Sequence, residues 1–322
     1  PDVSAWMPLL FLGVEWILSG RYRRGIATGA LGATLLLLGG HPETAFSLSL
    51  GLGVYFALRL AWNVRKGLPA WRPVAACIAM WTLALAVSAV MLFPLVEYLL
   101  NSSTFFDRPS QIRYALTPTS AASFWAPRFL GTWPDKNFWG ELNSNLQMML
   151  YPGMAVWLVV PLLFVRRRGA SDGPRRGWTP PAACLALAAA YAVMMAFAFP
   201  PFDKTQVLPV LGSMLVCYHV AFALFAFPLL AAMGLDHWTG TPRRWRELGW
   251  ALPVALAGML VMAVTYRFNA SLLYAMKQDG FVRQQAWIAV GLAASGFVLV
   301  GLHCLRPMPR AVPLLLTALL AA

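Results

Sequence analysis

Residues 73–96 read PVAACIAMWTLALAVSAVMLFPLV, an apolar run that contains no charged side chain. Its length matches the roughly 20 residues with which an α-helix crosses the hydrocarbon core of a bilayer. Similar runs recur along the chain, which is 59% hydrophobic and 11% charged, whereas soluble domains are about 25% charged. The sequence therefore predicts an all-α, polytopic bundle of transmembrane helices.

Polar breaks divide the chain into about ten such runs. They occupy residues 5–18, 25–40, 45–62, 73–96, 148–165, 180–199, 211–235, 250–265 and 287–305, and a last one begins at 312. The chain begins without Met and stops inside an apolar run, so both ends look cut. We therefore expect residues 1–322 to be a transmembrane helical domain, of about ten membrane segments, from a longer protein.

Basic residues cluster after every second run. The clusters begin at Arg21, Arg65, Arg166, Arg243 and Arg306. Because Lys and Arg are enriched in cytoplasmic loops, this alternation predicts that the long polar interval, residues 97–147, is an extracytoplasmic loop region. Basic cytoplasmic loops also explain the net charge of +13, so we expect no nucleic acid partner. We expect a multi-pass protein of the plasma membrane, surrounded by lipid bilayer, with any site facing outside the cytoplasm.

Seven polar side chains on the predicted outer face are candidates for substrate binding. They are His41, Glu43, Glu97, Arg108, Arg113, Arg128 and His219. The residues His41-Pro42-Glu43 suit a substrate or a metal, but they favour a plain helix start, where Pro fits the first turn and the helix dipole favours Glu. Glu97 ends an apolar run, so its carboxylate is either a site residue or simply solvated.

The three arginines lie in a segment rich in Phe, Tyr and Trp, which leaves two interpretations open. Guanidinium groups bind phosphate through paired hydrogen bonds, so the arginines suit a phosphate or pyrophosphate group. They equally suit ordinary solvation or contact with anionic lipid headgroups. His219, inside an apolar run, is either a hydrogen-bonded core residue or a functional one. Glu15 precedes the first basic cluster, and we interpret it as a helix-end residue whose carboxylate reaches the interface.

Other motifs are missing from the sequence. The four cysteines stand singly in apolar segments and predict neither a disulfide framework nor a metal site. The sequence contains no phosphate-binding glycine loop, no G-x-S-x-G elbow and no H-E-x-x-H. It therefore requires no cofactor.

The order of several short motifs resembles the YfhO-like bacterial membrane proteins, which belong to the GT-C class of glycosyltransferases. The motifs are Trp6-Met-Pro8, Gly40-His41-Pro42, Pro94-Leu-Val-Glu97, Trp125-Ala-Pro127-Arg128-Phe-Leu-Gly131 and Leu150-Tyr-Pro-Gly153. The resemblance covers most of residues 1–240. Two positions depart from it, since the family favours Gln where this chain has Glu43, and Arg or Ser where it has Tyr218-His219.

The resemblance implies a GT-C-like bundle in a bacterial inner membrane that moves a sugar from a polyprenyl-phosphate donor to a cell-envelope glycan or lipid. In that class the catalytic acid lies in the first outer loop, so the resemblance places the base upstream of residue 1. No residue of this chain inherits that role. Two alternatives stay open: a transporter or flippase for a lipid-linked or anionic solute, and a non-catalytic membrane assembly subunit.

Overall fold

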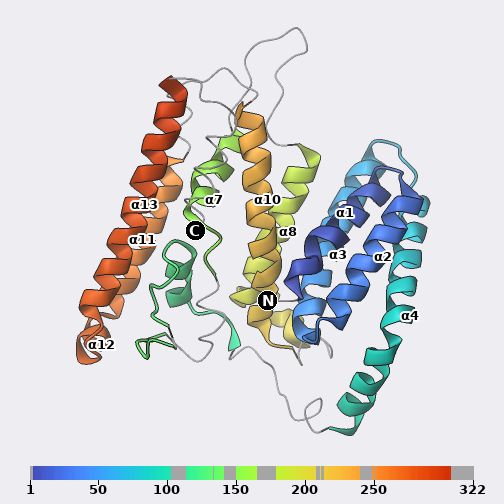
Figure 1. Ribbon diagram of the computed structural model, residues 1–322, viewed down its shortest axis with the longest axis horizontal. Coiled ribbons are helices and arrows are strands. Elements are labelled where there is room, and N and C mark those ends of the chain that lie inside the picture. Colours follow the sequence, from blue (N-terminus) through green and yellow to red (C-terminus); the bar gives the residue numbers. More distant parts are fainter. Residues whose placement is uncertain are drawn as a thin grey trace. The chain divides into compact units, whose positions relative to one another are not determined.

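The computed structural model describes residues 3–102, 114–132, 134–140, 150–164, 179–207, 211, 214–239, 249 and 251–305. Every regular element within these ranges is an α-helix or a 3₁₀-helix, as Figure 1 shows. The prediction of an all-α protein is therefore confirmed for the described part of the chain. The residues form two compact units, Pro1–Ala115 with Ala183–Phe225, and Leu116–Ala182 with Ala226–Ala322. We call them the first and the second unit.

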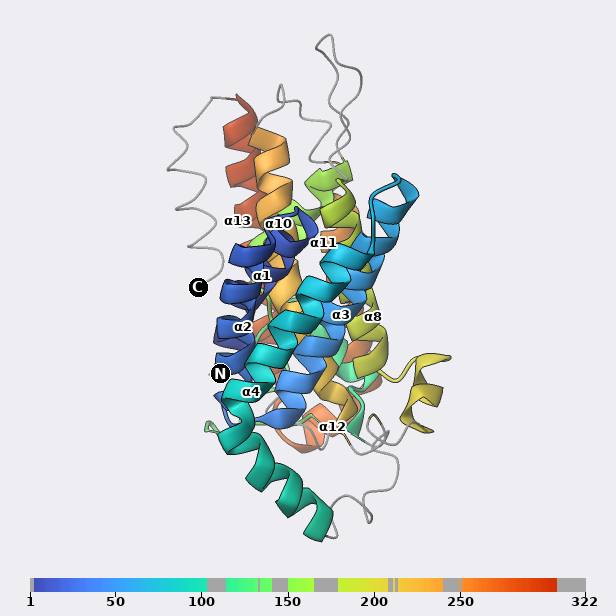
Figure 2. The ribbon, with the colours of Figure 1, turned by 90° about the vertical axis from the view of Figure 1, so that its right-hand side faces the viewer.

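The first unit contains the first four α-helices of the chain together with most of α8. Its elements are η1 (Ser4–Trp6), α1 (Met7–Leu18), α2 (Tyr22–Leu38), α3 (Pro42–Arg65), α4 (Trp71–Asn101), most of α8 (Pro180–Ala196), η5 (Phe202–Val207), η6 (Val216–His219) and the start of α10 (Val220–Thr239). Helix α2 packs against α4, and Figure 2 shows these two helices side by side. Pro94 lies inside α4, near its end.

Glycines allow α1 and α2 to pack with their backbones close together. A Cβ added at Gly32 would stand 2.6 Å from the Leu10 nitrogen, and one at Gly25 would stand 2.8 Å from the Ile17 nitrogen. Because residue 10 faces residue 32 and residue 17 faces residue 25, the two helices are antiparallel. Small residues allow the same close approach of backbones where helices associate inside membranes.

Contacts between helices define two ends of the first unit. Phe11 contacts Tyr55, and the pair one turn further along both helices, Glu15 and Arg59, is also in contact. Helices α1 and α3 therefore run in the same direction, so the turns that follow them, residues 19–21 and 66–70, share one end. We call this the Arg21 end. The starts of α3 and η6 lie together at the opposite end, which we call the His41 end.

The second unit combines α-helices of very different length with a folded segment of the predicted outer interval. Its elements are η3 (Pro118–Phe124), α7 (Met154–Val159), η4 (Val160–Phe164), the rest of α10, α11 (Leu252–Phe268), α12 (Ala270–Ala275) and α13 (Asp279–Leu305). Phe129 and Trp139 share one buried core with Met262, Leu273 and Val282 of the last three helices. The described part of the interval 97–147 that belongs to this unit is thus packed into a core that it shares with α11, α12 and α13.

Three helices of the described residues are long and apolar enough to cross a membrane. They are Pro42–Arg65, Trp71–Asn101 and Val216–His237. Four apolar helices are shorter, namely Ser4–Leu18, Met154–Leu163, Pro180–Ala196 and Leu252–Phe268. On α4 large apolar side chains stay exposed, with Val90 at 77% and Phe93 at 75%, which suits contact with lipid better than with water.

Candidate functional site

The start of α3 carries two of the predicted site residues, His41 and Glu43. The His41 imidazole caps the helix, because its Nδ1 accepts a hydrogen bond from the Thr44 backbone nitrogen at 3.2 Å. The same Nδ1 lies 3.0 Å from the Thr44 hydroxyl. Pro42 occupies the first turn, where its missing N–H costs nothing, and Glu43 sits where the helix dipole favours a carboxylate. The predicted helix start is therefore present, and it leaves the His41 ring exposed.

Element η6 brings further polar side chains to the His41 end. The Tyr218 ring meets the His41 ring edge-on, with centroids 4.7 Å apart and planes at 64°. The sequence predicted His41, Glu43 and His219 as three separate candidates. The fold places all three on α3 and η6, which meet at this end.

His219 is the most deeply placed member of this group. Its side chain is 2% exposed, and within the described residues its Nε2 has no hydrogen-bond partner. An unpaired polar group in a buried position costs about 1–3 kcal/mol. Only Nε2 is known to lack a partner among the described residues, so the choice between a core residue and a functional one stays a prediction.

The His41 end has the chemistry of a site for a hydroxylated ligand. It combines an exposed imidazole, a half-buried phenol ring and a half-buried carboxylate, all next to helices that are apolar enough to cross a membrane. Such groups donate and accept hydrogen bonds, and His and Glu also transfer protons. No cluster of three or more His, Cys, Asp or Glu side chains suited to a metal ion occurs among the described residues.

Two other predicted residues, Glu97 and Arg128, lie on other elements of the chain. Glu97 lies in the last turns of α4 of the first unit, and its side chain is exposed. Arg128 is exposed in the second unit. Arg108 and Arg113 fall outside the residues that the structure describes, so the predicted group of three arginines rests on Arg128 alone.

Arg128 projects from a rigid turn. Phe129 next to it is fully buried, and its carbonyl oxygen accepts a hydrogen bond of 2.8 Å from the Trp139 indole nitrogen. Gly131 adopts φ = 79°, where a side chain would be strained and its Cβ would strike residue 137. Within the described residues the Arg128 guanidinium has no carboxylate partner. An exposed cation without a described carboxylate partner suits an anionic group.

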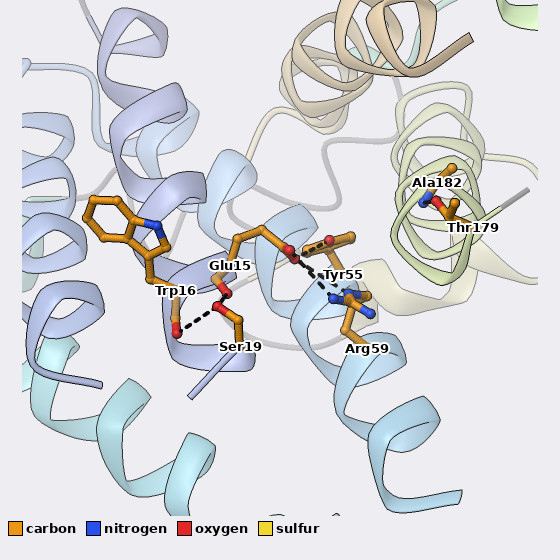
Figure 3. Close-up of polar contacts among 7 residues, drawn as sticks. All are labelled: Glu15, Trp16, Ser19, Tyr55, Arg59, Thr179 and Ala182. Atoms are coloured by element: carbon orange, nitrogen blue, oxygen red, sulfur yellow. Dashed lines mark hydrogen bonds and ion pairs between the residues drawn. The ribbon is translucent and has the colours of Figure 1, made fainter. Parts of the chain in front are cut away.

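A second polar cluster, which the sequence analysis did not identify, lies nearer the other end of α3 (Figure 3). The Tyr55 hydroxyl donates to the Glu15 carboxylate, and the Arg59 Nε and Nη2 lie 3.4 and 3.5 Å from its two oxygens. Tyr55 is fully buried, and the Arg59 and Glu15 side chains are 13% and 28% exposed. Glu15 therefore pairs across helices, in contrast to the predicted helix-end residue with a carboxylate at the interface.

A signal for this cluster was present in the sequence. Glu15 and Arg59 are ionisable residues of opposite sign inside two apolar runs that are expected to cross in the same direction. Charges inside membrane segments generally pair with one another, so both residues could have been named as candidates for an ion pair, although the rule does not say which partner each takes.

Comparison with known proteins gave no match: no family model, no characterised protein and no solved structure corresponds to this chain.

Proposed function

We propose that this chain forms part of a polytopic membrane glycosyltransferase of about ten membrane segments in a bacterial inner membrane. It moves a sugar from a polyprenyl-phosphate donor to a cell-envelope acceptor on the extracytoplasmic face. The three long apolar helices and the four shorter ones support the membrane assignment. The YfhO-like order of short motifs supports the GT-C assignment.

The observation that carries the proposal is the convergence of polar groups at the His41 end. Two of the three helices long enough to span a bilayer, α3 and the helix formed by η6 with α10, begin beside one another there. A lipid-linked sugar has an apolar tail and a hydroxylated head, so it needs polar groups where apolar helices begin. His41, Glu43 and His219 would hydrogen-bond the sugar or assist proton transfer.

Arg128 has a separate role in the proposal. A polyprenyl-phosphate leaves with negative charge when the sugar is transferred, and a positioned guanidinium stabilises charge that develops in a transition state. Glu97, Arg108 and Arg113 stay candidates for substrate binding. No residue of this chain is proposed as the base.

The test is sugar transfer by membranes that contain the full-length protein, with labelled polyprenyl-phosphate sugar as donor. His41→Asn is the informative variant, because Asn also caps helices well and so preserves the start of α3 while removing the imidazole. We expect it to lower transfer about tenfold, since one hydrogen bond in a desolvated site is worth about 1–3 kcal/mol. Arg128→Gln should lower transfer independently.

Lys204→Gln is the control for the loss of an exposed cation, because Lys204 is an exposed residue of the first unit that has no part in the proposal. Unchanged transfer by both His41→Asn and Arg128→Gln, at wild-type protein levels, would remove these residues from the site. Movement of the labelled lipid across vesicle membranes without any transfer would favour the flippase alternative instead.

A further inference from the structure

Apart from Lys204 and the paired Arg59, the described cations of the first unit lie at its Arg21 end. Six cations occupy the Arg21 end, and all are exposed: Arg21, Arg23, Arg24, Arg65, Lys66 and Arg72. Among the described residues, the acids Glu43 and Glu97 lie on the far ends of α3 and α4, and Asp203 lies in η5, beyond the end of α8. The one acid placed towards the Arg21 end, Glu15, is paired with Arg59. The six cations therefore lack a described counter-charge.

The two turns of the Arg21 end come together because of helix packing. Helix α1 leads into Arg21, Arg23 and Arg24, whereas α3 leads into Arg65 and Lys66. The Glu15–Arg59 contact joins these helices close to their ends, and so brings two separate basic stretches to one surface (Figure 3). The same ion pair neutralises the Glu15 carboxylate, which would otherwise reduce the positive charge of this surface.

Aromatic and aliphatic side chains lie among the cations. The Lys66 ammonium lies 5.6 Å from the centre of the Trp62 ring, and the Arg72 guanidinium lies 5.3 Å from that of Trp71. Trp71 is 66% exposed and Leu68 is 53% exposed. Exposed Trp beside Lys and Arg is typical of the boundary between a bilayer and water, where the ring sits at headgroup depth and the cation reaches phosphate.

We propose that the Arg21 end is a binding surface for the phosphate headgroups of anionic phospholipids. Helices α3 and α4 meet here, and both are apolar enough to cross a membrane, so the headgroup layer is what their cations would encounter. Arginine holds phosphate through two parallel hydrogen bonds, which suits the Arg21, Arg23 and Arg24 turn. The proposal depends on membrane insertion of this unit, and it is independent of the transfer reaction.

The experiment is native mass spectrometry of the full chain in an uncharged detergent, with equal amounts of phosphatidylglycerol and phosphatidylcholine added. We expect wild-type protein to retain mainly phosphatidylglycerol. The variants Arg21→Gln/Arg23→Gln/Arg24→Gln and Arg65→Gln/Lys66→Gln/Arg72→Gln should each lower that preference about tenfold or more. A basic residue near an anionic surface contributes about fivefold in affinity, and three would contribute more before screening.

A triple variant with the same loss of charge elsewhere serves as the control. Lys204→Gln/Arg267→Gln/Lys277→Gln neutralises three exposed cations outside the Arg21 end and should keep the wild-type preference. An equal loss in this control, or no loss in the other two variants, would overturn the proposal. An oligonucleotide that displaced phosphatidylglycerol from wild-type protein at equal concentration would also overturn it, in favour of a soluble polyanion.

A salt titration of wild-type protein keeps the proposal testable if the variants fail to fold. Liposome-reconstituted wild type should lose its enrichment of phosphatidylglycerol as the Debye length falls from about 10 Å at 0.1 M salt to about 3 Å at 1 M. Enrichment that does not change with salt would show that charge is not what selects the lipid.

Discussion

Replacing Arg59 by Leu tests whether the Glu15–Tyr55–Arg59 cluster holds the first unit together. The substitution removes the cation and leaves a side chain that suits an apolar helix. The Glu15 carboxylate would then keep only the Tyr55 hydroxyl as a described partner, inside a cluster where Tyr55 is fully buried. We expect α1 and α3 to separate more readily. Without Arg59 the partly buried Glu15 carboxylate has no counter-ion, so its hydration in the unfolded state is more favourable than its place in the folded unit.

The burial of the pair sets the size of the effect. Breaking a fully buried ion pair costs about 3–5 kcal/mol, whereas an exposed pair is worth about 0–1 kcal/mol. The side chains are 13% and 28% exposed, and their contacts of 3.4 and 3.5 Å are long for charged hydrogen bonds. We therefore expect a loss of about 1–3 kcal/mol for Arg59→Leu, between the two limits.

A double variant separates the lost attraction from the stranded charge. In Glu15→Gln/Arg59→Leu no charge remains, and the side-chain amide oxygen that replaces the carboxylate still accepts from the Tyr55 hydroxyl. This variant should be more stable than Arg59→Leu alone, because the penalty comes mainly from the unpaired carboxylate. The measurement is unfolding of the purified chain in mild detergent by added dodecyl sulfate, followed by far-ultraviolet circular dichroism.

Arg65→Leu is the control, since Arg65 is an exposed arginine on the same helix and should change stability by less than about 0.5 kcal/mol. The reasoning fails if Arg59→Leu is as stable as wild type. It also fails if the double variant is less stable than Arg59→Leu, because the stranded carboxylate would then not be the cause.

Three further predictions follow from packing and charge. Gly13→Leu places a side chain against the α2 backbone, and we expect it to cost about 3 kcal/mol in the same unfolding assay. In Gly258→Leu the new Cβ meets the ring of Trp125, so near-ultraviolet circular dichroism of the tryptophans should change together with a loss of about 1–3 kcal/mol. The hydrogen bond from Tyr266 and the Arg283 guanidinium hold the pKa of Asp279 below its ordinary 3.8, so its contribution to stability is present above that pH and is lost as the pH falls further. The difference in melting temperature between wild type and Asp279→Asn should therefore shrink under acid conditions, and a constant difference would contradict the assignment.

Much of the fold follows from local sequence patterns. The run 73–96 appears as α4, extended to Trp71–Asn101, and the run 45–62 appears as α3, extended to Pro42–Arg65. The Gly-Gly-His-Pro-Glu sequence correctly marked the start of α3, because cap and first-turn preferences act over a few residues. The run 148–165 became the shorter pair α7 and η4, since hydrophobicity alone sets neither helix length nor helix type.

The candidate site was predictable only in part. His41, Glu43 and His219 were named from the sequence, but nothing local showed that η6 would meet the start of α3. Arg128 was also named, while the burial of Phe129 and Trp139 around it was not foreseen. The interval 97–147 was interpreted as a loop because of its polar residues, and its apolar residues proved sufficient to build a core with α11, α12 and α13.

The sequence by itself determined the helical class, the apolar character of the helices and the alternation of basic turns, since each depends on residue type and short-range spacing. Only the tertiary structure decided that Glu15 pairs with Arg59, 44 positions away, and that two basic turns share one end of the first unit. The physical reason is that contacts between helices depend on which faces approach closely. In this unit Gly25 and Gly32 set that approach for α1 and α2, and a pattern of apolar runs carries no such information.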